Sequence, residues 1–256
     1  MLTGSLLILF AVLAAVPAKP VDVVPDFRDL TIRTHATMGS RHTLETTWYF
    51  KGPRMRSEIK DLESSDQPAH VNIYQCDQGT RVLLNENSKT YNSFPADPLE
   101  MRETARLAPE IPLSGGEVTV TTDSVDTGER RQVGSYQAHH VKTTITVEPG
   151  PEAVSHESKT EVDGWYLDLP GLYCQDNNDK RMGWSMAWPG RRDRIVFKQI
   201  GTARRGFAIE ETTTQSEAKK VFVHKTELLE MSEKPLDESL FELPAGYSPA
   251  PPRTRQ

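Results

Sequence analysis

The sequence is poor in the residues that mark several protein classes. Only 2 of its 256 residues are cysteine and 7% are aromatic, and no Cys/His spacing of the kind that binds zinc occurs. Clustered Lys and Arg are also missing, and the formal net charge is -6, which argues against nucleic acid or anionic lipid headgroups as the main partner. With 36% hydrophobic and 26% charged residues, the composition predicts a globular protein.

An apolar run near the N-terminus predicts export. Residues 1–18 carry no charged side chain, and residues 6–16 are all apolar. Val16-Pro17-Ala18 places small residues at the -3 and -1 positions that a signal peptidase reads, so we expect cleavage after Ala18. The run is shorter than the roughly twenty residues that a membrane span needs. We therefore predict a signal peptide over residues 1–18 and an exported, periplasmic or extracellular protein without a membrane anchor; a retained anchor is the alternative.

The two cysteines can form one disulfide in that compartment. Cys76 and Cys174 make an even number in a chain predicted to be exported, where the surroundings are oxidising. A bond between them is one interpretation. Two buried thiols that act as small hydrophobic residues are the other.

Apolar and polar residues alternate over long stretches after the signal, starting at residues 30–38. This alternation is typical of β-strands with one buried face, and similar runs up to residue 231 predict about a dozen strands. Short segments rich in turn residues, such as 77–79 and 126–129, predict loops between antiparallel neighbours. Parallel pairs are not expected, because helices to build the crossovers are scarce.

One helix and one domain are expected. Asp97 can cap a helix that begins there and runs to about Leu107, and Pro109 ends it. No internal repeat or linker divides the chain, so residues 19–247 are predicted to form a single domain. Residues 248–256 are rich in proline and are predicted to be a disordered tail.

So many strands in one sheet cannot stay flat, because strand twist accumulates. We therefore predict a mainly β fold: a single large curved antiparallel sheet, an incomplete half-barrel of about 10–12 strands, with one or a few short helices on its concave side. If the concave face carries Trp48, Phe50, Met55 and Ile59, a cavity for an apolar ligand follows. An ordinary packed sandwich with a filled core is the alternative.

An aromatic cluster lies further along the chain. Three of the four tryptophans, including Trp165 and Trp184, fall within residues 165–188. They could cap an apolar cavity or touch lipid, as amphipathic aromatic residues do at wet boundaries, or they could form a small satellite core under a long loop. The predicted ligand-binding residues are therefore Trp48, Phe50, Met55, Ile59, Trp165 and Trp184.

Catalytic and metal-binding patterns are weak. His139 and His140 are adjacent in a predicted strand and should point to opposite faces, so they cannot easily bind one ion. Residues 183–187 resemble a degraded form of the Gly-x-Ser-x-Gly nucleophile motif, but Pro189 and Gly190 follow too closely for the helix that this motif requires. We predict no catalytic residue, no metal and no cofactor.

Several segments resemble a bacterial exported family. Residues 206–214 read GFAIEETTT, residues 134–141 read GSYQAHHV, and residues 236–247 read LDESLFELPAGY. Together with residues 52–56 and 89–91 they are similar to uncharacterised secreted proteins related to the periplasmic lipoprotein-carrier (LolA/LppX-like) superfamily. The likeness covers most of the mature chain.

This resemblance implies an incomplete antiparallel barrel around short helices, with an apolar interior that accommodates acyl chains in characterised relatives. The expected function is non-catalytic binding of a lipid, a lipoprotein acyl chain or another apolar ligand by a monomeric protein. The alternatives are a structural or interaction module of the cell envelope with a filled core, and an envelope hydrolase. Residues 177–192 depart from the carrier pattern.

Overall fold

The computed structural model describes residues 29–39, 42–64, 66–95, 115–169, 187–188, 191–217 and 220–251, most of which lie in strands. The strands are β1 (Leu30–Met38), β2 (His42–Lys51), β3 (Arg54–Asp61), β4 (His70–Gln75), β5 (Thr80–Asn85), β6 (Thr90–Pro95), β7 (Glu117–Val133), β8 (Tyr136–Pro149), β9 (Ser158–Leu167), β10 (Ala187–Trp188), β11 (Arg191–Arg192), β12 (Arg194–Ile200), β13 (Phe207–Glu217), β14 (Lys220–Ser232) and β15 (Ser248–Pro249). Helical structure in these ranges is limited to the 3-10 turns η1 (Cys76–Gln78) and η4 (Glu238–Phe241).

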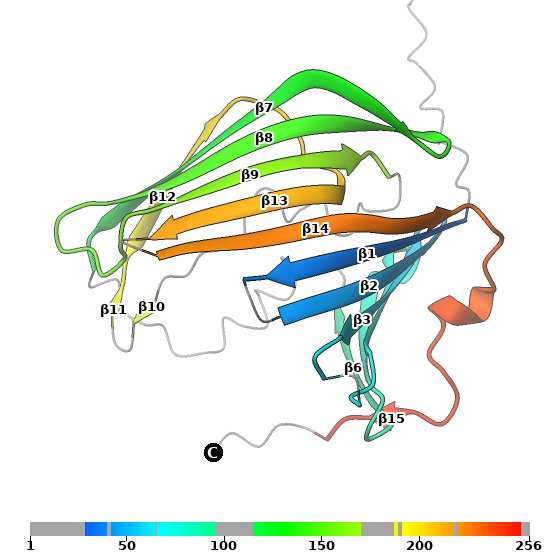
Figure 1. Ribbon diagram of the computed structural model, residues 1–256. Coiled ribbons are helices and arrows are strands. Elements are labelled where there is room, and N and C mark those ends of the chain that lie inside the picture. The colour runs from blue at the N-terminus through cyan, green and yellow to red at the C-terminus, as the bar shows by residue number, and fades with distance from the viewer. Residues whose placement is uncertain are drawn as a thin grey trace, which may run out of the picture.

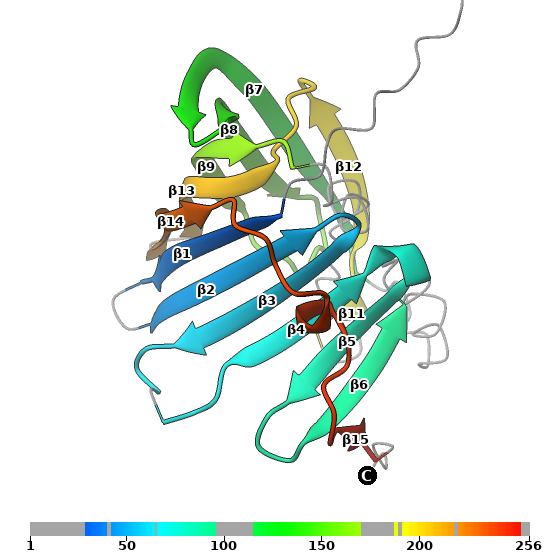
Figure 2. The ribbon, with the colours of Figure 1, turned by 90° about the vertical axis from the view of Figure 1, so that its right-hand side faces the viewer.

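Thirteen of the described strands form one sheet, in the order β12-β7-β8-β9-β13-β14-β1-β2-β3-β4-β5-β6-β15. The sheet is large, curved and open, and its two edges do not meet (Figures 1 and 2). Accumulated twist accounts for the curvature, since a sheet of this width cannot remain flat. The predicted fold class, a mainly β protein built on one large curved sheet, is confirmed. The predicted helix at residues 97–107 and the signal peptide lie outside the described residues.

Two of the sheet's pairings are parallel, which corrects the expectation of antiparallel neighbours throughout. β12 pairs parallel with β7 at one edge, and the two residues of β15 pair parallel with β6 at the other. No helical crossover is needed for β12, because β8 and β9 lie between β7 and β12 in the chain. β15 comprises residues 248 and 249, so the segment predicted as a disordered tail begins with two residues that pair in the sheet.

The hairpin of β7 and β8 differs from the prediction at one point. Residues 126–129 were expected to be the loop between two strands, but β7 continues through them and the register with β8 shifts between Asp126 and Arg130. The turn itself is Gly134-Ser135, because Val133 pairs with Tyr136. Gly134 has a φ of 58°, a conformation that glycine adopts without strain. A bulge and a turn use the same polar and glycine residues, so composition did not distinguish them.

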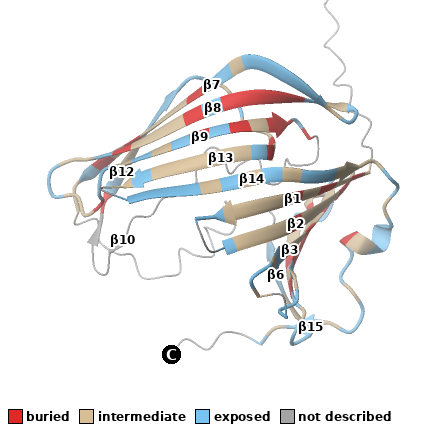
Figure 3. Cartoon of the chain, viewed as in Figure 1, coloured by how far each residue is buried: buried red, intermediate tan, exposed pale blue. Residues whose placement is uncertain are grey.

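Among the residues that the structure describes, most buried apolar side chains fall into three groups. The largest, called here the main cluster, contains Leu30, Ile32, Phe50, Met55, Ala138, Leu167, Leu169, Phe207 and Ile209. A second group lies on β4 and β5, and a third on β7 and β8. Figure 3 shows buried residues on β8 and β9 and at one end of β1 to β3, whereas β14 is half-buried or exposed along its length.

The chain after β14 fastens the β3–β6 part of the sheet. It crosses the near end of the sheet in Figure 2 and includes η4. Phe241 of η4 is fully buried, its carbonyl oxygen accepts a hydrogen bond from Nε2 of Gln75 at 2.9 Å, and the carbonyl oxygen of Leu240 accepts one from Arg56 at 3.2 Å. Tyr247 packs against the second buried group. The segment of residues 236–247 therefore supplies a plug for this part of the sheet.

Candidate functional site

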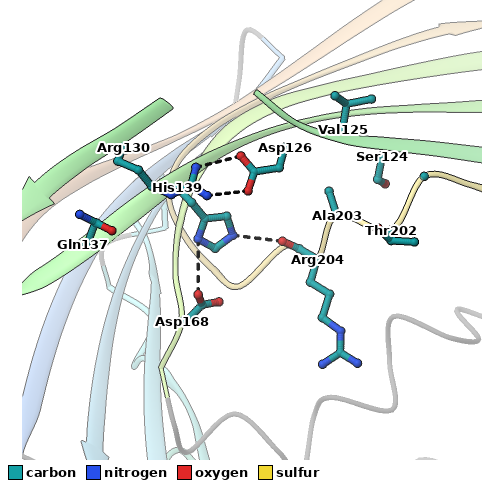
Figure 4. A pocket seen from close by; sticks show the side chains of 11 residues that line it. Ser124, Val125, Asp126, Arg130, Gln137, His139, Asp168, Thr202, Ala203 and Arg204 are labelled. Atoms are coloured by element: carbon teal, nitrogen blue, oxygen red, sulfur yellow. Dashed lines mark hydrogen bonds and ion pairs between the residues drawn. The ribbon is translucent and has the colours of Figure 1, made fainter. Parts of the chain in front are cut away.

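A pocket of about 650 Å³ lies between the strands β7 and β8 and the segment that connects β12 to β13. It is lined by Ser124, Val125, Asp126 and Arg130 of β7, Gln137 and His139 of β8, Asp168, and residues 201–204. Figure 4 shows His139 between the Asp126–Arg130 pair on one side and the backbone of Arg204 on the other. We call it the His139 pocket. Its volume is within the range of small-molecule sites, about 300–1,000 Å³.

Asp126 and Arg130 form one wall of the pocket as a two-pronged ion pair. Both guanidinium NH groups donate to the two carboxylate oxygens at 2.8 Å, and the backbone N–H of Gly128 donates to Asp126 at 2.8 Å. These hydrogen bonds, first of all those from Arg130, lower the pKa of Asp126 to about 2. The bulge in β7 creates this geometry, because it brings the two residues, four apart in sequence, within reach of each other.

His139 forms the floor between the strand and the connecting segment. Its side chain is nearly buried, and Nε2–H donates to the carbonyl oxygen of Arg204 at 3.1 Å. Nδ1 lies 3.7 Å from Oδ2 of Asp168, whose side chain is exposed. Since the carbonyl can only accept, the hydrogen in this contact belongs to Nε2. The other ring nitrogen, Nδ1, is the one that faces Asp168. His139 therefore fastens the segment of residues 201–204 to the sheet and presents Nδ1 toward the pocket.

A buried polar network lies behind His139. Its ring is 6.1 Å from that of Tyr166, the residue opposite it on β9. The Tyr166 hydroxyl donates to Glu211 on β13 at 2.7 Å, and Thr213 donates to the same carboxylate at 3.2 Å. Burial, together with the negative charge of Glu211, raises the pKa of Tyr166 above its usual value. This network holds β9 and β13 in register beneath the pocket.

The charges around the pocket balance. Asp126 and Asp168 carry negative charge, while Arg130 and Arg204 carry positive charge. Ser124, the hydroxyl on the pocket wall, hydrogen-bonds to Thr143 at 3.0 Å, so its polar atom is engaged by the sheet rather than by His139. Val125 and Ala203 add apolar surface. The arrangement suits the polar, uncharged or zwitterionic end of a ligand.

Four of the residues predicted to bind an apolar ligand come together at the main cluster. Phe50 and Met55 are buried members of it, and Trp48 and Trp165 are half-buried and pack against it. The ring of Phe207 meets those of Trp48 and Phe50 edge-on, at 5.4 and 5.5 Å between centroids. Phe50 and Met55 thus pack within the protein, whereas the two tryptophans retain partial access.

The other predicted residues lie elsewhere. Ile59 is half-buried on β3, four residues after Met55, and is paired with Thr46 of β2. Trp184 lies outside the described residues, as does Cys174. Cys76, in η1, is disulfide-bonded.

Trp165 takes part in a stacked cluster of charged residues. His140 stacks on its ring at 4.9 Å, and the guanidinium of Arg131 lies 4.6 Å from the ring centroid. Nε2 of His140 is 2.6 Å from Oδ1 of Asp163, and Nδ1 is 3.1 Å from the hydroxyl of Thr127. His139 and His140 thus have separate partners, as expected for adjacent strand residues.

Three residues of the pocket, Asp126, Arg130 and Asp168, were not among the predicted site residues. The only available signal was the pair His139-His140 beside a polar Asp-Thr-Gly-Glu segment, and the contribution of residues 201–204 depends on a contact between distant parts of the chain. Within the described ranges, no three His, Cys, Asp or Glu side chains are grouped as metal ligands would be.

Comparisons with known proteins give no family for this chain. No protein-family model matches it, and no curated protein matches it. Among the described residues, no helix has the length and apolar character required to cross a bilayer.

Proposed function

We propose that this protein is an exported, non-catalytic binding protein for a lipid, a lipoprotein acyl chain or another apolar ligand, as the resemblance to the lipoprotein-carrier-like half-barrels implies. The observation that carries the proposal is the surface of the main cluster, where the rings of Trp48 and Trp165 pack against buried residues and remain half-buried. The His139 pocket is a separate surface. Ala138 of the cluster and His139 of the pocket are successive residues of β8, so they point to opposite faces of the sheet.

The two surfaces favour different chemical groups. The half-buried rings of Trp48 and Trp165 offer apolar area beside a core that is already packed. The balanced charges of the pocket favour a polar head that is neutral or zwitterionic, because a single net charge would meet both an attractive and a repulsive partner. Acyl chains of a lipid or a lipoprotein suit the apolar surface that the two tryptophans offer.

Native mass spectrometry of the protein purified from its own cell envelope tests the proposal, together with uptake of the fluorescent fatty acid cis-parinaric acid. We expect co-purifying lipid and saturable uptake. Trp48→Ala removes a half-buried ring from the apolar surface and should weaken uptake at least tenfold. Phe94→Ala, which removes an exposed ring on β6 outside the main cluster, is the matched control and should leave uptake unchanged. Absence of both lipid and uptake would contradict the proposal and favour the filled structural module.

A hydrolase is the second candidate, and the contacts of His140 favour it. Thr127, His140 and Asp163 are joined by hydrogen bonds in the order hydroxyl, imidazole, carboxylate, which is the order that nucleophilic catalysis requires. The Thr127 hydroxyl also accepts the N–H of Glu129 at 3.3 Å, which anchors it in the bulge. Hydrolysis of p-nitrophenyl butyrate that disappears in both Thr127→Ala and His140→Ala would support this candidate; no hydrolysis by the unaltered protein would remove it.

A further inference from the structure

Large apolar side chains are exposed at one end of the β14–β1 pair. Val221, Phe222 and Val223 at the start of β14 are 64%, 52% and 38% exposed, and Met38 at the end of β1 is 48% exposed. The ends are adjacent, because Met38 pairs with His224 and the N–H of Gly39 donates to the carbonyl of Val223 at 3.0 Å. Figure 3 shows this end of β14 in the exposed colour. We call these four residues the β14 tip.

The apolar side chains of the β14 tip project from both faces of the sheet. Successive strand residues point to opposite faces, so Phe222 shares a face with His224 and its partner Met38, while Val221 and Val223 lie on the other. A folded protein partner would cover one face of a strand pair. A medium that surrounds the end of the sheet buries both faces at once, which is what the hydrocarbon and interfacial layer of a membrane does.

Two lysines flank the tip. Lys220 precedes Val221, and Lys225 follows two residues after Val223. Both are exposed, and they lie on opposite faces by the same alternation. Glu217, the partner of Lys220 in the β13–β14 register, is the nearest acidic residue on the hairpin. Lysines beside buried apolar side chains can extend their ammonium groups to lipid phosphates.

We propose that the β14 tip inserts into the interfacial layer of a phospholipid bilayer and docks the protein there reversibly, with Lys220 and Lys225 on the headgroup phosphates. The overall charge of -6 gives no long-range attraction to such a surface, so apolar insertion supplies most of the affinity and the two lysines add a preference for anionic lipid. The proposal is independent of whether the His139 pocket binds a ligand.

Partition onto sonicated vesicles measures this docking, with phosphatidylcholine alone and with a phosphatidylcholine–phosphatidylglycerol mixture. The purified protein is used, and intact mass defines its N-terminus. We expect Val221→Ser/Phe222→Ser to lower the partition coefficient at least tenfold on both vesicles, because two apolar side chains no longer leave water. Lys220→Gln and Lys225→Gln should each lower it about fivefold on the anionic vesicles at low salt and leave binding to phosphatidylcholine unchanged.

Phe197→Ser is the matched control. Phe197, on the edge strand β12, is 56% exposed, nearly the same as Phe222, but lies outside the tip. Vesicle binding that Phe197→Ser reduces as much as the tip variants would overturn the proposal, as would an absence of binding by the unaltered protein. Light scattering tests whether a second copy of the chain covers the tip instead of a bilayer. A dimer that dissociates when the tip residues are substituted would show this and would also overturn the proposal.

Discussion

At the scale of single residues, the structure shows polar side chains whose roles depend on neighbours that are distant in sequence. Tyr166 is an example. It is buried on β9, and its hydroxyl finds Glu211 forty-five residues later, on β13. The ring packs in the sheet, and its hydroxyl gives the Glu211 carboxylate a hydrogen-bond donor in addition to Thr213.

We expect Tyr166→Phe to lower the free energy of unfolding by about 1–3 kcal/mol, because Glu211 loses a charge-assisted hydrogen bond at a half-buried position. Urea denaturation measures the change. Tyr91→Phe removes the same atom from a half-buried ring on β6 and is the control. Equal stability of Tyr166→Phe and the unaltered protein would show that the hydroxyl contributes nothing to the fold.

Asp126 makes the pocket wall sensitive to acid. Its pKa in the folded protein is about 2, below the value of about 3.9 for an unfolded chain. A lowered folded pKa means that the stabilisation by Arg130 is fully present above pH 4 and is lost as the pH falls toward 2. We expect Asp126→Asn to reduce the slope of unfolding free energy against pH between 4 and 2. Unfolding midpoints across this range measure it, with Asp66→Asn, at an exposed position, as the control. An unchanged slope would contradict this expectation.

At the scale of elements, the strands could be predicted from the sequence, whereas the pocket could not. Period two identified β1 and β2 because each has one buried face. It did not identify the bulge at residues 126–129, since a bulge and a loop share their composition. Residues 201–204 reach the pocket only because the connection from β12 to β13 passes over β7 and β8, and Asp168 because it follows β9, the neighbour of β8; a single sequence carries no signal for these contacts.

The edge strand β12 depends on one buried carboxylate. Asp193, just before β12, accepts hydrogen bonds from the N–H groups of Val154 and Ser155, at 2.9–3.1 Å, and from the Ser155 hydroxyl at 2.5 Å. Burial raises the pKa of Asp193, but the hydrogen bonds from Ser155 and the backbone lower it further, so its folded pKa lies below the usual value. This carboxylate ties the loop after β8 to the start of β12.

We expect Asp193→Ala to lower the free energy of unfolding by about 2–4 kcal/mol, because several buried donors lose their acceptor together. The loss should be local first. Hydrogen exchange at Ile195 and Phe197 of β12 should accelerate more than exchange in β1, and Asp193→Asn, which keeps the shape of the side chain, should show an intermediate effect. Uniform acceleration in both strands would mean that β12 is not held separately.

At the scale of the whole molecule, the sheet is wide enough to curl yet remains open, and its two ends are completed in different ways. One edge is the parallel strand β12. The other is shortened to the two residues of β15, which limits exposed backbone on β6 and so protects against edge pairing. That a sheet of a dozen strands would curve was predictable from twist alone; which side chains would fill the curve was not, because it depends on how far the strands bend.

The segment from β14 to β15 determines whether the β3–β6 part of the sheet is stable. Phe241 is the one buried residue of η4, and Gln75 holds the Phe241 backbone, so removing the ring opens a cavity against β3 and β4.

We expect Phe241→Ala to lower the free energy of unfolding by about 3–5 kcal/mol, whereas Leu243→Ala, two residues away and 39% exposed, should change it by less than about 0.5 kcal/mol. If the segment is a plug, hydrogen exchange in Phe241→Ala will accelerate in β3 and β4 before β8 and β9, because η4 contacts β3 and β4. Simultaneous acceleration in all four strands would instead mean that the curved sheet unfolds as one cooperative unit and that the plug stabilises the molecule as a whole.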